Sequence, residues 1–207
     1  MKAIVKQAKN ISDKSDLIIL TDKDSDLKGI LKNKEEIDYV RARIAAEYIA
    51  YINQLSRTIF FVRTKTSEKP GVQKENFRRA GFELSELLKK EKIVNVQVVS
   101  FLKDTASTLD FTEGLLLSSY QFLKYKTKKK EDGLSRVEVV ADINPRDLEE
   151  LNNLVKATCI ARDLVNEPVV FLTAVQLSKE IEKLGKEAGF KTEILGKEKI
   201  KILGMGG

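Results

Sequence analysis

Short apolar runs alternate with amphipathic stretches through the first two thirds of the chain, and this order restricts the fold more than any single residue does. Asp16 to Thr21 is a short continuous apolar run, which is typical of a strand covered on both faces. Residues 35–48 place apolar side chains at spacings of three and four, namely Ile37, Val40, Ile44 and Tyr48. A helix that packs on a sheet is therefore predicted directly after the strand.

The same alternation continues downstream. Further strands are predicted at 49–53, 58–62, 94–98 and 136–141, and further helices at 73–90 and 107–122. The two strands at 49–53 and 58–62 are separated by Leu55-Ser56-Arg57, which predicts a tight connection between them. Strands that alternate with helices predict a three-layer α/β domain, with a sheet between two layers of helices.

Composition bounds the size of the protein and its chemistry. A chain of 207 residues, 42% of them hydrophobic, can build one domain and part of another. Cys159 is the only cysteine, so no intrachain disulfide forms, and a small buried helix residue is the favoured interpretation. The chain contains no histidine, which excludes Cys-His and Ser-His nucleophilic couples and histidine-rich zinc sites. No catalytic residue is predicted in this chain.

The N-terminus carries Lys2, Lys6 and Lys9 but no apolar segment after them that would resemble a secretion signal. No stretch approaches the length needed to cross a bilayer. A cytoplasmic protein without a membrane partner is predicted.

The net charge of +6 raises the question of nucleic-acid binding. One loop holds the candidate contacts, which are Lys124, Lys126, Lys128, Lys129 and Lys130. A lysine cluster followed by Glu131-Asp132-Gly133 is typical of a solvated turn, and Tyr125 is the only aromatic residue inside the cluster. A solvated turn is therefore favoured over contact with phosphates.

The last sixty residues carry helix signals and two short motifs. Asn144-Pro145 begins a helix that is predicted to run to about Val165, because Asn144 can cap and proline is tolerated in the first turn. Thr173 to Gln176 forms a capping box that begins another helix, which Gly189 ends. A strand at 191–195 and a short helix at 197–203 are predicted to follow.

Two blocks carry a family resemblance: ARDLVNEP at 161–168 and LGMGG at 203–207. In this order and spacing they resemble the domain junction of leucyl (cytosol) aminopeptidases. The resemblance implies three parts: an N-terminal domain with the macro-domain-like fold, a mixed sheet flanked by helices, at 1–143; a connecting helix at 144–167; and a truncated start of the C-terminal peptidase domain, a second α/β domain, at 168–207. Such a fold suggests a nucleotide pocket, but the glycines of residues 1–150 are isolated, and phosphate-binding turns need closely spaced ones.

The resemblance implies that the parent protein is a metalloexopeptidase, which releases N-terminal amino acids from peptides with two divalent metal ions, zinc or manganese. The family carries its metal ligands in a Gly-Lys-Gly-x-x-x-Asp-Ser-Gly-Gly region and an Asn-Thr-Asp-Ala-Glu-Gly-Arg block, and neither string occurs here. We therefore expect no catalytic residue, no metal ligand and no cofactor in this chain.

The family is usually hexameric, which implies that this part serves subunit packing and controls substrate access. The alternative is a stand-alone binding or assembly module, with DNA contact through the loop from Lys124 to Lys130.

Overall fold

The computed structural model describes residues 4–22, 25–127 and 133–205. The chain divides into two compact units, Met1–Ile160 and Ala161–Gly207, and each is described by itself. The division lies within helix α4 (Pro145–Asn166).

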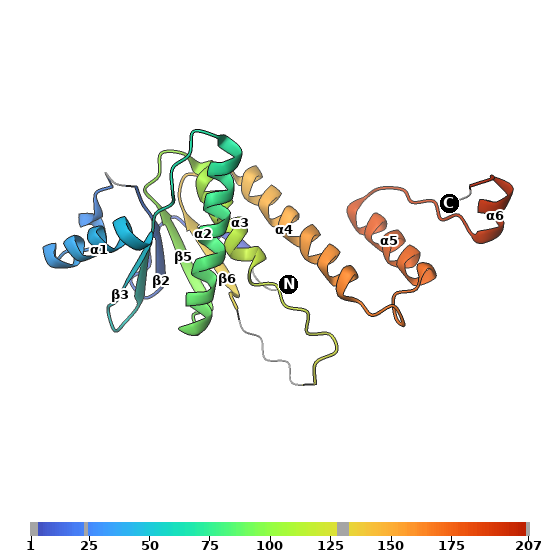
Figure 1. Cartoon of the computed structure of the whole chain (residues 1–207), viewed down its shortest axis with the longest axis horizontal. Helices are drawn as coiled ribbons and strands as arrows, with labels where there is room; N and C mark the ends of the chain where they lie inside the picture. The colour runs from blue at the N-terminus through green and yellow to red at the C-terminus, as the bar shows by residue number, and fades with distance from the viewer. Residues whose placement is uncertain (1–3, 23–24, 128–132, 206–207) are drawn as a thin grey trace. The chain divides into compact units, whose positions relative to one another are not determined.

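A six-stranded mixed sheet forms the centre of the first unit (Figure 1). The strands are β1 (Ile4–Gln7), β2 (Asp16–Leu20), β3 (Ile49–Asn53), β4 (Thr58–Val62), β5 (Asn95–Ser100) and β6 (Arg136–Val140). Their order is β1-β6-β5-β2-β4-β3, and all neighbours are parallel except β3, which runs antiparallel to β4. The predicted α/β class with a mixed sheet is confirmed.

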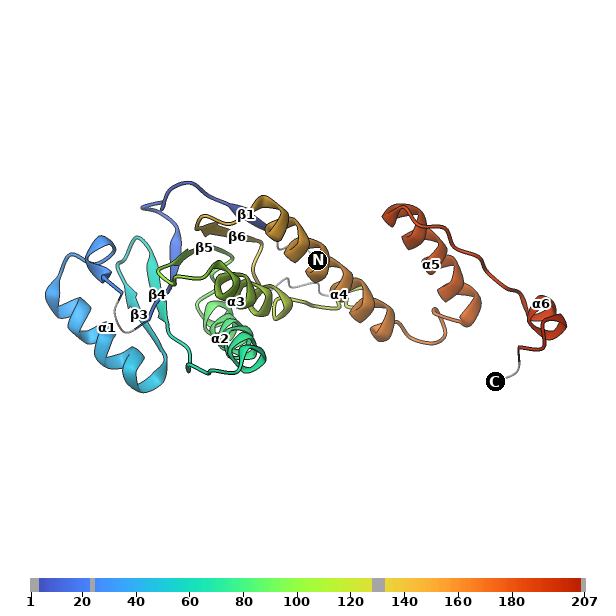
Figure 2. The same ribbon diagram turned by 90° about the horizontal axis from the view of Figure 1, so that it is seen from above.

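Helices cover both faces of the sheet, which makes three layers (Figure 2). The short helix η1 (Leu27–Gly29) and α1 (Lys34–Glu47) pack on one face. The helices α2 (Pro70–Lys90), α3 (Thr105–Leu117) and α4 pack on the other. Strand β2 is continuously apolar because helices cover both of its faces. Leu17 and Ile19 face the layer of η1 and α1, and Ile18 and Leu20 face the layer of α2, α3 and α4.

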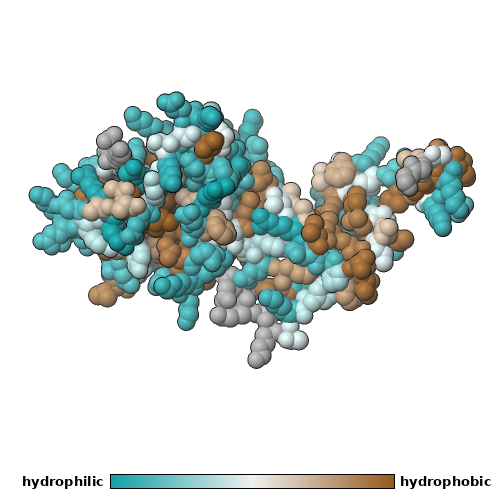
Figure 3. All heavy atoms as spheres, in the orientation of Figure 1, coloured by the Kyte–Doolittle hydropathy of each residue, from teal (hydrophilic) through white to brown (hydrophobic). Residues whose placement is uncertain are grey.

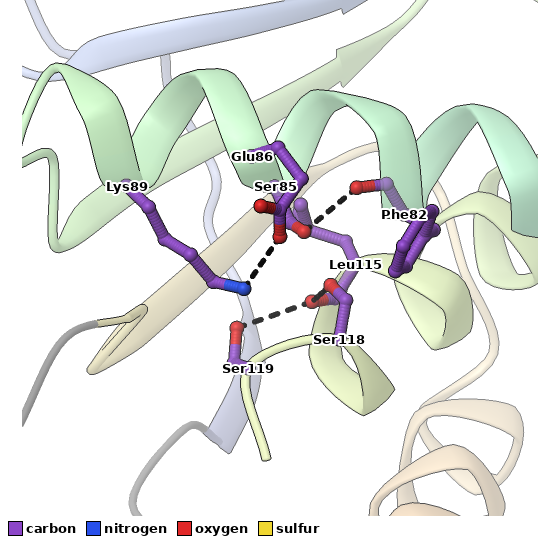
Figure 4. Close-up of polar contacts among 7 residues, drawn as sticks. All are labelled: Phe82, Ser85, Glu86, Lys89, Leu115, Ser118 and Ser119. Atoms are coloured by element: carbon purple, nitrogen blue, oxygen red, sulfur yellow. Dashed lines mark hydrogen bonds and ion pairs between the residues drawn. The ribbon is translucent and has the colours of Figure 1, made fainter. Parts of the chain in front are cut away.

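Helix α3 ends earlier than predicted, at Leu117 rather than residue 122. The hydroxyls of Ser118 and Ser119 both donate to the carbonyl oxygen of Leu115, at 2.7 and 3.2 Å (Figure 4). These bonds occupy a carbonyl of the last helical turn, which lacks an intrahelical partner. The two serines therefore satisfy a carbonyl group at the end of the helix.

Strand β1 is absent from the sequence-based prediction, because only Val5 is buried and the period-two pattern is too short to detect. It lies at one edge of the sheet, where the side chain of Asn152 in α4 forms hydrogen bonds to its backbone. The backbone N–H of Val5 donates to Oδ1 of Asn152 at 3.1 Å, and Nδ2 of Asn152 donates to the carbonyl oxygen of Val5 at 3.0 Å. One amide side chain thus occupies both backbone groups of an edge residue.

Replacing Asn152 by aspartate is expected to lower the free energy of unfolding by about 1–2 kcal/mol, because a carboxylate oxygen then faces the Val5 carbonyl instead of a donor. The matched control is Asn153→Asp, the same change at the next, exposed position of α4, with an effect within about 0.5 kcal/mol. Urea unfolding of both variants measures the difference. Equal stability of the two variants would contradict the role given to Asn152.

The second unit contains the end of α4, then α5 (Ala174–Ala188) and α6 (Lys197–Ile202). Thr173 caps α5 as predicted, accepting from the N–H of Gln176 at 3.3 Å, whereas the Gln176 side chain donates to Glu180. The strand predicted at 191–195 is wrong: that segment has no regular structure, since no described strand lies beside it to pair with.

Large apolar side chains lie exposed along this second unit, where hydrophobic spheres are spread over the visible surface (Figure 3). They are Val165, Val169, Val170, Phe171, Val175, Ile181, Phe190, Ile194, Ile202, Leu203 and Met205. Among the described residues, the helices are each too short or too polar to span a membrane.

Candidate functional site

A concave feature lies where three helices follow three parallel strands. Helices α2, α3 and α4 come directly after β4, β5 and β6, so their first turns gather at the carboxyl edge of the sheet. Open α/β sheets commonly bind ligands outside this edge. A groove of 590 Å³ lies there. Residues of all three helices line it. They are Pro70, Gln73 and Lys74 of α2; Asp104, Ala106, Ser107, Leu109, Asp110 and Glu113 at the start of α3 and within it; and Asp147, Glu150, Leu151 and Leu154 of α4.

Acidic side chains dominate the polar part of the lining, namely Asp104, Asp110, Glu113, Asp147 and Glu150. Two of them form ion pairs with α2. Nζ of Lys74 lies 3.4 Å from Oδ1 of Asp110, and Nη2 of Arg78 lies 2.8 Å from Oε2 of Glu113. The bond to Glu113 raises the pKa of the Arg78 guanidinium further, so that this group stays charged. The groove is therefore negative at the end that α4 lines.

Burial raises the pKa of Asp110 above the ordinary 3.8, while the nearby Lys74 ammonium and Arg78 guanidinium act in the opposite direction. A raised pKa means that the carboxyl group of Asp110 keeps its proton in the folded protein at a pH at which the unfolded chain has already released it. The stabilisation from that proton is present below the ordinary pKa and is lost as the pH rises through the folded pKa. At neutral pH the ionised Asp110 is thus a cost to the fold.

Asp110→Asn is expected to leave the protein at least as stable as the wild type at neutral pH, and to remove the gain of stability that the wild type shows on mild acidification. Lys74→Met, which removes the attractive partner, should lower stability at neutral pH. Urea unfolding at neutral and mildly acidic pH measures both effects. A loss of stability in Asp110→Asn at neutral pH would show that the ion pair outweighs the burial of the carboxylate.

Side chains cap the starts of α3 and α4 at the groove, whereas α2 begins at Pro70 without a side-chain cap. Asp104 caps α3, accepting from the Ser107 N–H at 2.7 Å and from its hydroxyl at 2.9 Å. Asn144 accepts from the N–H of Arg146 at 3.0 Å at the start of α4. Carboxylates in the lining repel an anion as well. The groove is consequently unsuited to a nucleotide phosphate.

Two isolated glycines of the sequence meet in space at the crossing of α2 and α3. A Cβ on Gly81 would lie 2.3 Å from the carbonyl oxygen of Phe111, and one on Gly114 would lie 2.0 Å from that of Arg78. The glycines therefore serve the close approach of two helices rather than a ligand. Glycine inside a helix is unfavourable unless packing requires it, which is the only sequence signal that points to this pair.

No donor set for a metal ion occurs among residues 4–22, 25–127 and 133–205, where no three His, Cys, Asp or Glu side chains converge suitably. The acidic groove does not supply one either, because Asp110 and Glu113 are paired with basic groups and Asp104 caps a helix. Cys159 is a residue of α4 that is buried in the core, as predicted, and it forms no disulfide. The described residues thus do not fit the two-metal site that the resemblance implies.

The lysine loop is only partly described. Nζ of Lys124 lies 5.5 Å from the ring centroid of Tyr125, and that ring lies 6.0 Å from Phe122. Lys126 is exposed, whereas Lys128, Lys129 and Lys130 lie outside the described residues. Nucleic-acid contact by these lysines stays a prediction.

No family model matches the sequence. Comparison with curated proteins gives clear sequence relatives. A protein named "Probable cytosol aminopeptidase" from Clostridium tetani is 32% identical over 155 residues, which are 70% of this chain and 32% of the relative. Proteins of the same name from Aquifex aeolicus and Clostridium perfringens are 29% and 34% identical, over 71% and 65% of this chain and 30% of each relative. The chain belongs to the cytosol aminopeptidase family. It spans about a third of the length of these family members.

Solved structures support the family's fold. A mutant of tomato leucine aminopeptidase matches with a TM-score of 0.69 at 16% identity, over 99% of this chain and 46% of that one. The bottromycin maturation enzyme BotP matches with a TM-score of 0.67 at 19% identity, over 92% of this chain and 41% of that one. At these identities the likeness shows the fold, and it agrees with a part of a longer family architecture.

Proposed function

We propose that the chain is the N-terminal, non-catalytic portion of a metal-dependent leucyl aminopeptidase, which releases N-terminal amino acids from peptides in the cytoplasm. The observation that carries the proposal is the extent of the match. Most of this chain aligns with cytosol aminopeptidases, while the aligned region is about a third of each relative. The greater part of the family's sequence therefore has no counterpart here.

The distribution of chemistry supports this division. Neither family metal-ligand string occurs in the 207 residues, and the described residues offer no donor set. The two divalent metal ions, manganese or zinc, and the peptide substrate then belong to the rest of the enzyme. The first unit, a sheet covered on both faces, is the part that we assign to a macro-like N-terminal domain. Its role is subunit packing in a homo-oligomer, a hexamer in the family, and control of substrate access.

The exposed apolar side chains of the second unit are consistent with this assignment. So many exposed apolar side chains in one unit are typical of an interaction site or of a surface that another part of the protein covers. We assign residues 168–207 to the start of the peptidase domain, with the segment 144–167 as the connecting helix. In the whole enzyme the rest of that domain would cover the apolar side chains.

Reading the gene past the codon for Gly207 tests the proposal. Continuation into the Gly-Lys-Gly-x-x-x-Asp-Ser-Gly-Gly and Asn-Thr-Asp-Ala-Glu-Gly-Arg regions is the expected result. A stop codon at that point would contradict the aminopeptidase proposal and favour a stand-alone binding or assembly module.

A stand-alone module would bind DNA through the lysine loop. The observation that favours this second function is that Lys124 lies close to the exposed ring of Tyr125, on which a base could stack. A mobility-shift assay at low salt compares the wild type with a variant in which Lys124, Lys126, Lys128, Lys129 and Lys130 are glutamine. A salt-sensitive DNA shift that the variant loses would favour the module. We expect no shift from either protein.

A further inference from the structure

The two edges of the sheet differ in how they are protected. At one edge, Asn152 occupies both backbone groups of Val5 in β1. At the other edge, β3 pairs with β4 on its inner side, and no other described residue bonds to the outer side of Ile49–Asn53 (Figure 1). An edge of this kind presents free N–H and C=O groups to a partner strand.

The open edge also lacks the devices that keep edges from pairing. Natural edge strands are commonly blunted by lysine, proline or a bulge. Strand β3 contains neither residue, and it pairs with β4 residue for residue without a bulge. The stretch from Tyr48 to Ser56 has no charged residue, in a chain in which 33% of the residues are charged. Tyr51 in its centre is 50% exposed.

The turn after β3 presents a second unusual feature. Leu55 is 100% exposed, and its φ of 62° lies in the left-handed region that disfavours a side chain with a Cβ. The turn holds this conformation by two hydrogen bonds, from Leu55 N–H to Asn53 Oδ1 at 2.8 Å and from Gln54 N–H to the Arg57 carbonyl at 2.9 Å. Backbone strain of this kind persists only where the surrounding structure imposes it, and here it leaves an apolar side chain available for contact.

We propose that the outer edge of β3 pairs antiparallel with β3 of a second copy of this chain, across a twofold axis at Tyr51. An uncharged strand is complementary to itself in this arrangement: Ile49 lies opposite Asn53 and Ala50 opposite Ile52, so that no like charges face each other. The net charge of +6 repels two copies wherever they meet, and an uncharged edge adds no local contact between like charges to that repulsion. The inference deepens the proposed subunit-packing role, on which it rests.

Sedimentation equilibrium of the 207-residue chain over a concentration series tests the assignment. The variant Tyr51→Lys places two lysines opposite each other and should weaken association by about tenfold or more. The matched control is Tyr39→Lys, the same change at a tyrosine of α1 that is also 50% exposed, and it should associate as the wild type does. Thermal unfolding of each variant verifies that it is folded.

A second variant separates packing from folding. Leu55→Gly suits the positive φ, so it should raise the unfolding temperature while it weakens association. Association that Tyr51→Lys leaves unchanged would overturn the β3 edge and leave the packing role standing. A wild type that is monomeric at all concentrations would overturn both.

Discussion

Gly114→Ala is expected to lower the free energy of unfolding of the first unit by about 2–3 kcal/mol, the range for overpacking a closely packed contact. The added Cβ would lie 2.0 Å from the carbonyl oxygen and 2.7 Å from the Cα of Arg78. These are backbone atoms, so no side-chain rotation relieves the clash, and α2 and α3 must move apart. The free-energy cost of this clash outweighs the gain of at most about 1 kcal/mol that alanine gives over glycine in a helix.

The control for this prediction is on the same pair of helices. Gly71, in the first turn of α2, has no positive φ, and a Cβ added there would have no neighbouring atom within 4 Å. Gly71→Ala should therefore stabilise the protein by about 0.5–1 kcal/mol. Gly81→Ala should resemble Gly114→Ala, and the double variant should cost less than the sum, because one displacement of the helices accommodates both methyl groups.

Urea unfolding followed by far-UV circular dichroism measures these four variants. Separation of α2 from α3 would also pull Lys74 from Asp110 and Arg78 from Glu113, so the shape of the acidic groove depends on the glycine pair. If Gly114→Ala is as stable as Gly71→Ala, the close helix crossing is wrong.

Local periodicity is sufficient for the elements whose neighbours are close in sequence. The strands at 49–53 and 58–62 have the same bounds in the prediction and in the structure, because β-branched and aromatic residues alternate around a short turn. The buried strand β2 and the helix after it are predictable for similar reasons, since their apolar spacing reports directly which faces are covered.

The rest depends on contacts that are distant in sequence. Strand β1 exists because β6 and Asn152 hold it, and Asn152 lies 147 residues away from Val5. The groove needs the starts of three helices together, and the glycine pair is visible only once α2 and α3 cross. The segment 191–195 is the converse case: its residues suit a strand, but no partner strand is described beside it.

The second large prediction concerns activity. Purified residues 1–207 are expected to hydrolyse no leucyl peptide, because the chain contains no histidine, neither family metal-ligand string, and no described donor set for a metal ion. Under the proposed mechanism two metal ions activate the attacking water, and a chain without their ligands would have no substitute for them. The expected loss relative to a whole family member is therefore complete.

The measurement that tests this most directly is the release of a chromogenic amine from a leucyl amide by the purified 207-residue chain, with Mn²⁺ or Zn²⁺ added and with a chelator as control. We predict a rate equal to that of buffer with the same metal. Hydrolysis that rises with the concentration of the folded chain and stops on chelation would show that catalytic residues lie within these 207 residues, and would contradict the assignment of a non-catalytic portion.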